Sequence, residues 1–207
     1  DSSFTGDYTV VASNAVGVVT SAVARLEVGL TMINPSFEVD TFTVSPGYIS
    51  GNFPITGWTA SIESGTGINP AGTSPFANSG VIPDGSQVAF IQADGGTLSQ
   101  VISGLVVGKT YYLKFFENAR SGSSYTSPGL AVTLGGVSIV PVHTVSAGAY
   151  ARVVSGPFLA SSDSAELDFI KTAATTGGDS TVLIDSVAVL ELAPTAPTFL
   201  YQPQGFY

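Results

Sequence analysis

Short runs of alternating apolar and polar residues recur through the middle of the chain. They cover residues 87–92, 98–102, 110–118, 130–134, 137–140, 152–158, 165–171 and 181–192. Turn residues bound each run, as in Asp84-Gly85 and Asp94-Gly95-Gly96. A period of two between such turns is typical of antiparallel strands, and no long stretch has the period of a helix. The pattern therefore predicts an all-β antiparallel sandwich.

The run 110–118 indicates which residues face the core. A period of two places Tyr111, Leu113 and Phe115 on one face of the strand. The opposite face carries Tyr112, Lys114, Phe116, Asn118 and, if the strand continues, Arg120. The alternative is a face assignment shifted by one residue, which would make Tyr112 and Phe116 core residues.

The residues between 41 and 83 show little regular alternation and are rich in Gly, Pro, Ser and Asn. A loop region of this length is usually functional or organises a ligand. We therefore expect a long irregular segment that contributes to a binding surface.

The chain ends differ from its centre. The first segment follows the pattern Gly6-x-Tyr8-x-Val10-x-Ala12-x-Asn14-x-x-Gly17 and predicts a hairpin. It resembles the last two strands of a bacterial immunoglobulin-like domain, with Tyr8 as the tyrosine-corner residue. Phe4 departs from that pattern, and the alternative is a hairpin that belongs to the main sheet.

At the other end, residues 193–198 form a Pro-punctuated linker, and residues 199–205 resemble the first strand of a further such module. We expect an immunoglobulin-like hairpin at 1–30, one complete domain at 31–192, and a linker with a following strand at 193–207. The expected parent is a secreted bacterial protein of several modules, extracellular or at the cell surface.

Composition limits the partners. The 207 residues carry 15 acidic and 6 basic side chains, a net charge of −9, and no cysteine. The negative charge opposes binding to nucleic acid or anionic lipid. No apolar run reaches the roughly 20 residues of a spanning helix, so we expect no membrane insertion. The lack of cysteine leaves oxygen atoms as the plausible metal ligands.

An ordered set of short motifs runs through residues 31–192. They are Ile33-Asn34-Pro35-Ser36-Phe37-Glu38, Gly57-Trp58, Ile82-Pro83-Asp84-Gly85-Ser86-Gln87, Leu98-Ser99-Gln100, Gly104-Leu105-Val106-Val107-Gly108-Lys109-Thr110-Tyr111 and Ile184-Asp185-Ser186-Val187. As a set they resemble carbohydrate-binding modules of the galactose-binding-domain-like jelly-roll type, similar to families 4, 9 and 22. The resemblance implies a β-jelly roll and a non-catalytic module that binds a polysaccharide or oligosaccharide.

The resemblance also implies a structural calcium ion between the start of the domain and its last strand. The matching residues are Glu38 and Asp185, with Asn34 as a further ligand. A carboxylate in an apolar strand such as Ile184-Asp185 is costly to bury unless a cation pairs with it. The alternative is that Glu38 and Asp185 bind backbone amides or lie at the surface.

The residues give little support for catalysis. His143 is the only histidine, and the sequence offers no partner for it, which favours an imidazole at the surface or at the rim of the core. The carboxylates that could serve a glycosidase lie in no recognisable motif; they are Glu63, Asp84, Asp94, Glu117, Glu166 and Asp168. The sequence therefore predicts that the domain is not an enzyme.

A sugar site requires aromatic faces and planar polar side chains. The outer face of run 110–118, with a loop aromatic at its rim, predicts such a site from Tyr112, Phe116, Asn118, Arg120 and Tyr125, with Phe76 and Tyr150 as further rim candidates. Trp58, the single tryptophan, is predicted to pack in the core.

The alternative function is a structural or adhesive module of a surface or filament protein. Incomplete sandwiches at the ends would expose strand edges that neighbouring copies or modules could complete.

Overall fold

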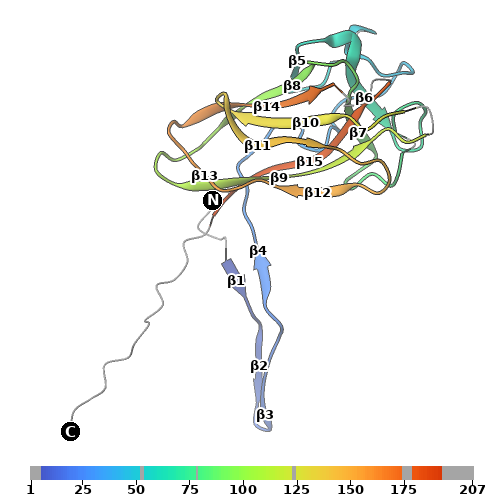
Figure 1. The fold of residues 1–207 in the computed structure, drawn as a ribbon. Coiled ribbons are helices and arrows are strands. Elements are labelled where there is room, and N and C mark those ends of the chain that lie inside the picture. The colour runs from blue at the N-terminus through green and yellow to red at the C-terminus, as the bar shows by residue number, and fades with distance from the viewer. Residues whose placement is uncertain (1–5, 52–53, 78, 123–124, 174–178, 193–207) are drawn as a thin grey trace.

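The structure is a computed structural model that describes residues 6–51, 54–77, 79–122, 125–173 and 179–192 (Figure 1). Two antiparallel sheets pack face to face in a jelly-roll sandwich, as the sequence predicts. The five-stranded sheet has the order β11 (Val137–Thr144), β10 (Gly129–Leu134), β14 (Ser164–Thr172), β8 (Thr97–Ser103) and β5 (Thr59–Ala60). The six-stranded sheet has the order β12 (Ala151–Val154), β9 (Thr110–Ala119), β15 (Val182–Glu191), β7 (Gln87–Ile91) and β6 (Thr66–Pro70), and β13 (Phe158–Leu159) also pairs with β9.

Helical structure in the described residues is confined to two short 3-10 turns, η2 (Ile49–Gly51) and η3 (Glu63–Gly65). None of the helices there is long and apolar enough to cross a membrane.

The inner faces of the two sheets form the main core. Tyr111, Leu113 and Phe115 of β9 are at most 1% exposed, which confirms the predicted face of this strand. Trp58 is also buried, as expected, and its ring packs against Phe169 of β14. Burial of such large side chains supplies most of the free energy that holds two sheets together.

The segment 41–83 is more regular than its sequence suggests, because it contains β5 and the edge strand β6. The residues of β6 are buried or half-buried, so the polar alternation that marks a half-exposed strand is missing. A second apolar cluster lies on the outer face of the six-stranded sheet, where Phe76 and Ile82 of this segment cover Phe90 and Leu183. The segment therefore closes part of the sheet face that was expected to be open.

The run predicted as one strand at 152–158 is divided into β12 and β13. The break falls at Gly156-Pro157, where the proline ring removes a backbone donor that a continuous strand would use. Ser155 secures the break, since its backbone N–H donates to the carbonyl oxygen of Leu113 at 2.9 Å. The edge of the six-stranded sheet is consequently interrupted opposite β11.

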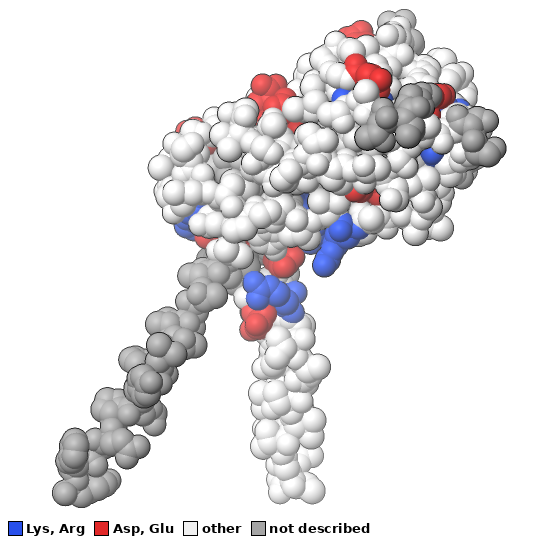
Figure 2. Space-filling model, in the orientation of Figure 1, with Lys and Arg blue, Asp and Glu red and all other residues white. Residues whose placement is uncertain are grey.

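The predicted N-terminal hairpin extends from the sandwich as a two-stranded arm (Figure 1). In it β1 (Gly6–Tyr8) pairs with β4 (Ala24–Leu26), and β2 (Val11–Asn14) pairs with β3 (Gly17–Thr20). Charged side chains gather where the arm joins the sandwich, and residues 9–23 carry none (Figure 2). The likeness of the arm to an immunoglobulin-like domain stays a prediction. The linker and strand predicted at 193–207 lie outside the described residues.

Candidate active site

The two carboxylates predicted to bind calcium meet at one loop, residues 84–87. Glu38 Oε1 accepts hydrogen bonds from the backbone N–H of Ser86 at 2.8 Å and of Gln87 at 2.5 Å. From the other side, Asp185 Oδ2 accepts the N–H of Asp84 at 2.9 Å. Burial raises the pKa of Asp185 to about 7, and the nearby carboxylates of Asp84 and Glu38 add to the rise.

The three predicted calcium ligands, Asn34, Glu38 and Asp185, differ in how well their oxygen atoms suit a calcium ion. Both oxygens of Asn34 already accept hydrogen bonds, Oδ1 from the N–H of Val39 at 3.1 Å and the carbonyl oxygen from the indole N–H of Trp58 at 3.0 Å, and its role as a ligand stays a prediction. Glu38 and Asp185 fit as two side-chain donors, since a cation would relieve the repulsion between the buried carboxylate of Asp185 and the exposed carboxylate of Glu38. No cluster of three or more His, Cys, Asp or Glu side chains suited to a metal occurs within the described ranges. Calcium binding stays a prediction.

The residues predicted to bind sugar lie on or beside the outer face of β9, but they do not form one open surface. Asn118 is fully buried. Its Nδ2 donates to the carbonyl oxygen of Gly148 at 2.9 Å and to that of Ser79, and its Oδ1 accepts the N–H of Gly148 at 3.1 Å. Asn118 thus joins two loops and presents no polar atom to solvent.

Two other residues of the predicted sugar site, Arg120 and Tyr125, contact each other. The guanidinium carbon of Arg120 lies 3.8 Å from the ring centroid of Tyr125, and its Nη1 lies 2.8 Å from Asp179 Oδ2. Tyr112 instead hydrogen-bonds Glu27 at the base of the arm. Phe116 lines a separate cavity of about 640 Å³ together with Ile82 and Tyr150. The structure brings together Arg120 and Tyr125, with Phe76 at 5.2 Å from the guanidinium, but not the whole predicted set.

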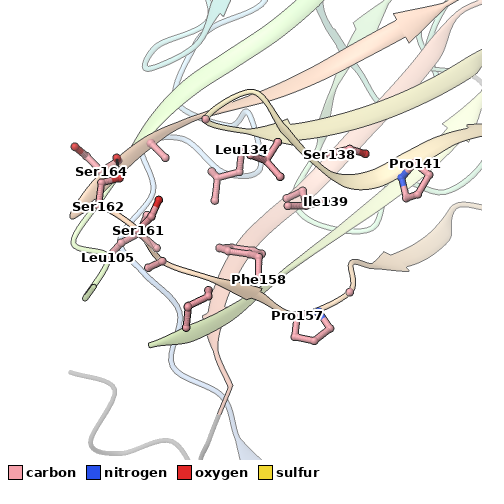
Figure 3. Close-up of a pocket in the computed structure, with 16 residues that line it drawn as sticks. Leu105, Leu134, Ser138, Ile139, Pro141, Pro157, Phe158, Ser161, Ser162 and Ser164 are labelled. Carbon is pink, nitrogen blue, oxygen red and sulfur yellow. Dashed lines mark hydrogen bonds between the residues drawn. The ribbon is translucent and has the colours of Figure 1, made fainter. Parts of the chain in front are cut away.

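A larger cavity, of about 760 Å³, lies between the edges of the two sheets, and we call it the edge cavity (Figure 3). Leu134 and Ile139 of the β10–β11 hairpin lie opposite Phe158 of β13. Three serines, Ser161, Ser162 and Ser164, line one end. Among the residues that the structure describes, no charged side chain lines the cavity. The gap that forms it follows from the break between β12 and β13.

Beyond the edge cavity, Glu117 and His143 join the two sheets. The register pairs His143 of β11 with the core residue Leu130, so the imidazole turns toward the six-stranded sheet. His143 Nε2 lies 3.0 and 2.9 Å from the two carboxylate oxygens of Glu117. His143 Nδ1 lies 3.1 Å from the carbonyl oxygen of Pro141, which lines the edge cavity. The pair therefore sits at the margin of that cavity.

Burial raises the pKa of Glu117, and the hydrogen bond and charge of His143 partly oppose the rise. The Glu117 side chain is 8% exposed and that of His143 is 32% exposed. A buried carboxyl group with a raised pKa, in contact with a partly accessible imidazole, is an arrangement suited to proton transfer.

Glu117 and His143 are separate candidates in the sequence, and no contact between them was predicted. One local signal was available, because Glu117 continues the inner-face series Tyr111, Leu113 and Phe115. A carboxylate at such a position needs a buried partner. The identity of that partner, 26 residues away in the chain, depends on how the sheets pack.

Residues 28–167 match the family model described as HpiC1-like, HpiC1 cyclase. The chain belongs to the HpiC1-like cyclase family. A cyclase structure from Fischerella sp. TAU resembles the chain at TM-score 0.58 and 14% identity, covering 82% of this chain and 100% of that one. The cyclase Fisc from Fischerella sp. TAU, in complex with (3Z)-3-(1-methyl-2-pyrrolidinylidene)-3H-indole, gives TM-score 0.56 and 15% identity, covering 81% and 98%. No curated protein sequence matches the chain.

Membership in a cyclase family corrects four predictions. The prediction of a non-catalytic carbohydrate-binding module is wrong, and so is its structural or adhesive alternative. The predicted absence of enzymatic activity is wrong as well. The predicted partners, a polysaccharide or strand edges of neighbouring copies, are also wrong. The resemblance on which they rested identified the jelly roll correctly but not the family, because its motifs mark turns and core positions that the fold requires whatever the function. A carbohydrate-binding module of family 4 gives TM-score 0.47 at 17% identity, over 78% of this chain and 100% of that one.

Proposed function

We propose that this chain is an enzyme that cyclises a small, uncharged, carbon-rich molecule in the edge cavity. The observation that carries the proposal is a cavity of about 760 Å³ without a charged lining side chain, in a chain of the HpiC1-like cyclase family. Ligand cavities usually span about 300 to 1,000 Å³ and have mostly apolar walls.

The walls suit the two tasks of a cyclisation. Apolar groups from both sheets, such as Ile139 and Phe158, would hold a flexible molecule in a folded conformation and so lower the entropic part of the barrier. A substrate that fills the cavity would displace water from these walls, and that water would otherwise capture a reactive intermediate. The serine hydroxyls at one end would orient a single polar group of the substrate.

Indole compounds are the first class to test, because the Fischerella cyclase structures hold indole-bearing molecules, one of them 4-(1H-indol-3-yl)butan-2-one. Cyclisation by proton transfer leaves the molecular mass unchanged. Incubation of the full chain with indoles that carry a pendant alkene should therefore give new isomers, separable by chromatography and equal in mass to the substrate.

A pair of variants localises the activity. Leu159 lines the edge cavity and is 67% exposed, and Val142 is 64% exposed on β11 without lining it. Leu159→Asp should lower isomer formation about tenfold or more, because a carboxylate in the wall must be desolvated when an apolar molecule binds. Val142→Asp should behave as the wild type. Absence of any isomer from the panel, or equal activity of the two variants, would contradict the proposal.

We also propose that Glu38 and Asp185 hold a calcium ion that ties the loop 84–87 to β15. Calcium would supply a divalent charge for two carboxylates that already bind this loop. Addition of calcium should raise the melting temperature of the wild type by mass action, and Asp185→Asn should abolish the increase. The proposal fails if calcium and a chelator give the same melting temperature in the wild type.

A further inference from the structure

The edge cavity offers few groups that could stabilise an electric charge. Of the described residues that line it, none has a charged side chain and only Phe158 is aromatic. Cyclisation by proton transfer leaves positive charge on carbon between the arrival of one proton and the departure of another. An apolar wall makes such a charge costly, because it replaces the water that would solvate it. The reaction therefore needs a lining group that favours positive charge.

The ring of Phe158 is supported from one side. The register places Phe158 of β13 directly opposite Tyr111 of β9, so both side chains point to the inner side of the six-stranded sheet. The two ring centroids lie 6.2 Å apart, and the ring planes differ by 26°. Tyr111 is 1% exposed, and its hydroxyl accepts the backbone N–H of Val106 at 3.0 Å. Tyr111 is therefore a fixed support for the Phe158 ring.

The other side of the Phe158 ring is open to the edge cavity. Among the described strands β13 pairs only with β9, so no strand flanks it on the side away from Tyr111. Phe158 lines the cavity and Tyr111 does not, and Leu134 and Ile139 form the opposite wall (Figure 3). The face of an aromatic ring carries partial negative charge and attracts a cation within about 6 Å of its centroid.

We infer that Phe158 is a catalytic residue of the edge cavity, and that its open ring face stabilises the positive charge of the cyclising molecule. The inference rests on the proposed function and adds the group that contacts the charged carbon. Phe158 forms no covalent bond in this role. The net charge of −9 acts in the same direction, since a negative protein field favours a positive species.

Two ligands that differ only in charge test the inference without any reaction. They are N,N,N-trimethyl-2-(1H-indol-3-yl)ethan-1-aminium and 3-(3,3-dimethylbutyl)-1H-indole, in which a carbon atom takes the place of the ammonium nitrogen. Calorimetric titration of the full chain with each ligand gives its dissociation constant. Each bound ligand should also shift the methyl resonances of Ile139, which lies across the cavity from Phe158.

Fluorination of Phe158 should weaken the binding of the ammonium ligand alone. Fluorine withdraws electrons from the ring and so reduces the negative charge on its face, while the ring stays apolar and similar in size. Replacement of Phe158 by 4-fluoro-, 3,5-difluoro- and 3,4,5-trifluorophenylalanine should lower the affinity for the ammonium ligand in steps, to about tenfold for the last. The affinity for the neutral ligand should stay unchanged.

A matched control and two further variants complete the test. The same fluorinated series at Phe42, which is half-buried against the main core and does not line the edge cavity, should change neither affinity. Phe158→Leu keeps an apolar side chain without a ring and should lower isomer formation about tenfold or more. Phe158→Tyr keeps the ring and should retain most of the wild-type rate.

The outcomes distinguish this inference from the proposed function. A stepwise loss confined to the ammonium ligand, without any cyclised isomer, supports Phe158 as the cation-binding group and overturns the cyclisation. Isomers formed equally well by Phe158→Leu keep the cyclisation and overturn the role of Phe158. Equal effects of fluorine on both ligands, no effect on either, no binding of the ammonium ligand, or Ile139 resonances that do not move also overturn that role.

Discussion

At the scale of single residues, Lys171 is a charge placed inside the sandwich. It follows Leu167 and Phe169 on the inner face of β14, its side chain is fully buried, and its ammonium group binds the carboxylate of Asp94. Lys171→Met should leave the free energy of unfolding unchanged or raise it by about 1 kcal/mol, because the lost ion pair is offset by the lost desolvation cost. Asp94 stays solvated in that variant, since its side chain is 60% exposed.

Removal of Asp94, the other partner of the ion pair, should lower the free energy of unfolding. Asp94→Ala leaves a buried ammonium group without its carboxylate and should lower the free energy of unfolding by about 2 kcal/mol. Urea denaturation measures both variants. Lys109→Met, which breaks a pair between a 43% exposed Lys109 and a 15% exposed Glu191, is the control and should cost less than about 1 kcal/mol. Equal losses for Lys171→Met and Asp94→Ala would show that the pair is net stabilising.

The raised pKa of Glu117 gives a second prediction at this scale, a pH dependence of stability. The folded state holds the Glu117 proton to a higher pH than the unfolded chain, whose carboxyl has its ordinary pKa of 4.5. Between these two pKa values the folded state binds more protons, so its stability falls as the pH rises. Relative to Glu117→Gln, the wild type should therefore lose stability from pH 4.5 upward until the folded-state pKa is passed, in thermal melts at a series of pH values. A gain with rising pH would mean that the ion pair with His143 outweighs burial.

At the scale of elements, the loop 84–87 depends on Glu38. Gly85 has φ +64°, and a Cβ atom there would lie 2.5 Å from the carboxyl carbon of Glu38. Gly95 has φ +74° with nothing within 4 Å of its Cβ position. Both substitutions by Ala cost about 1 kcal/mol of backbone strain, but Gly85→Ala should cost at least about 1 kcal/mol more because it displaces Glu38 from the loop. Thermal denaturation of the two variants tests the difference, and equal losses would contradict the role of Glu38.

At the scale of the whole molecule, the arm and the sandwich are almost independent. The side chains of β2, β3 and β4 are exposed, and an ion pair joins the arm to the sandwich at its base, where Glu27 binds Lys114 at 3.2 Å. Deletion of residues 1–26 should therefore change the melting temperature by no more than about 2 °C, since it removes little buried apolar surface. Circular dichroism melts measure this, and a large loss would show that the arm stabilises the sandwich. An extracellular location stays a prediction.

The sequence by itself determined the features that depend on neighbours along the chain. Alternation fixed the inner face of β9, turn residues separated most strands, and apolar content placed Trp58 in the core, because period and turn geometry are local properties. Only the tertiary structure decided the candidate site. The edge cavity exists because the chain breaks at Gly156-Pro157 opposite β11, and Glu117 meets His143 because the edge strand β11 of one sheet packs over β9 of the other. Neither the edge cavity nor the contact between Glu117 and His143 leaves a pattern in the sequence. The distance between side chains on separate sheets is determined by packing and not by their spacing along the chain.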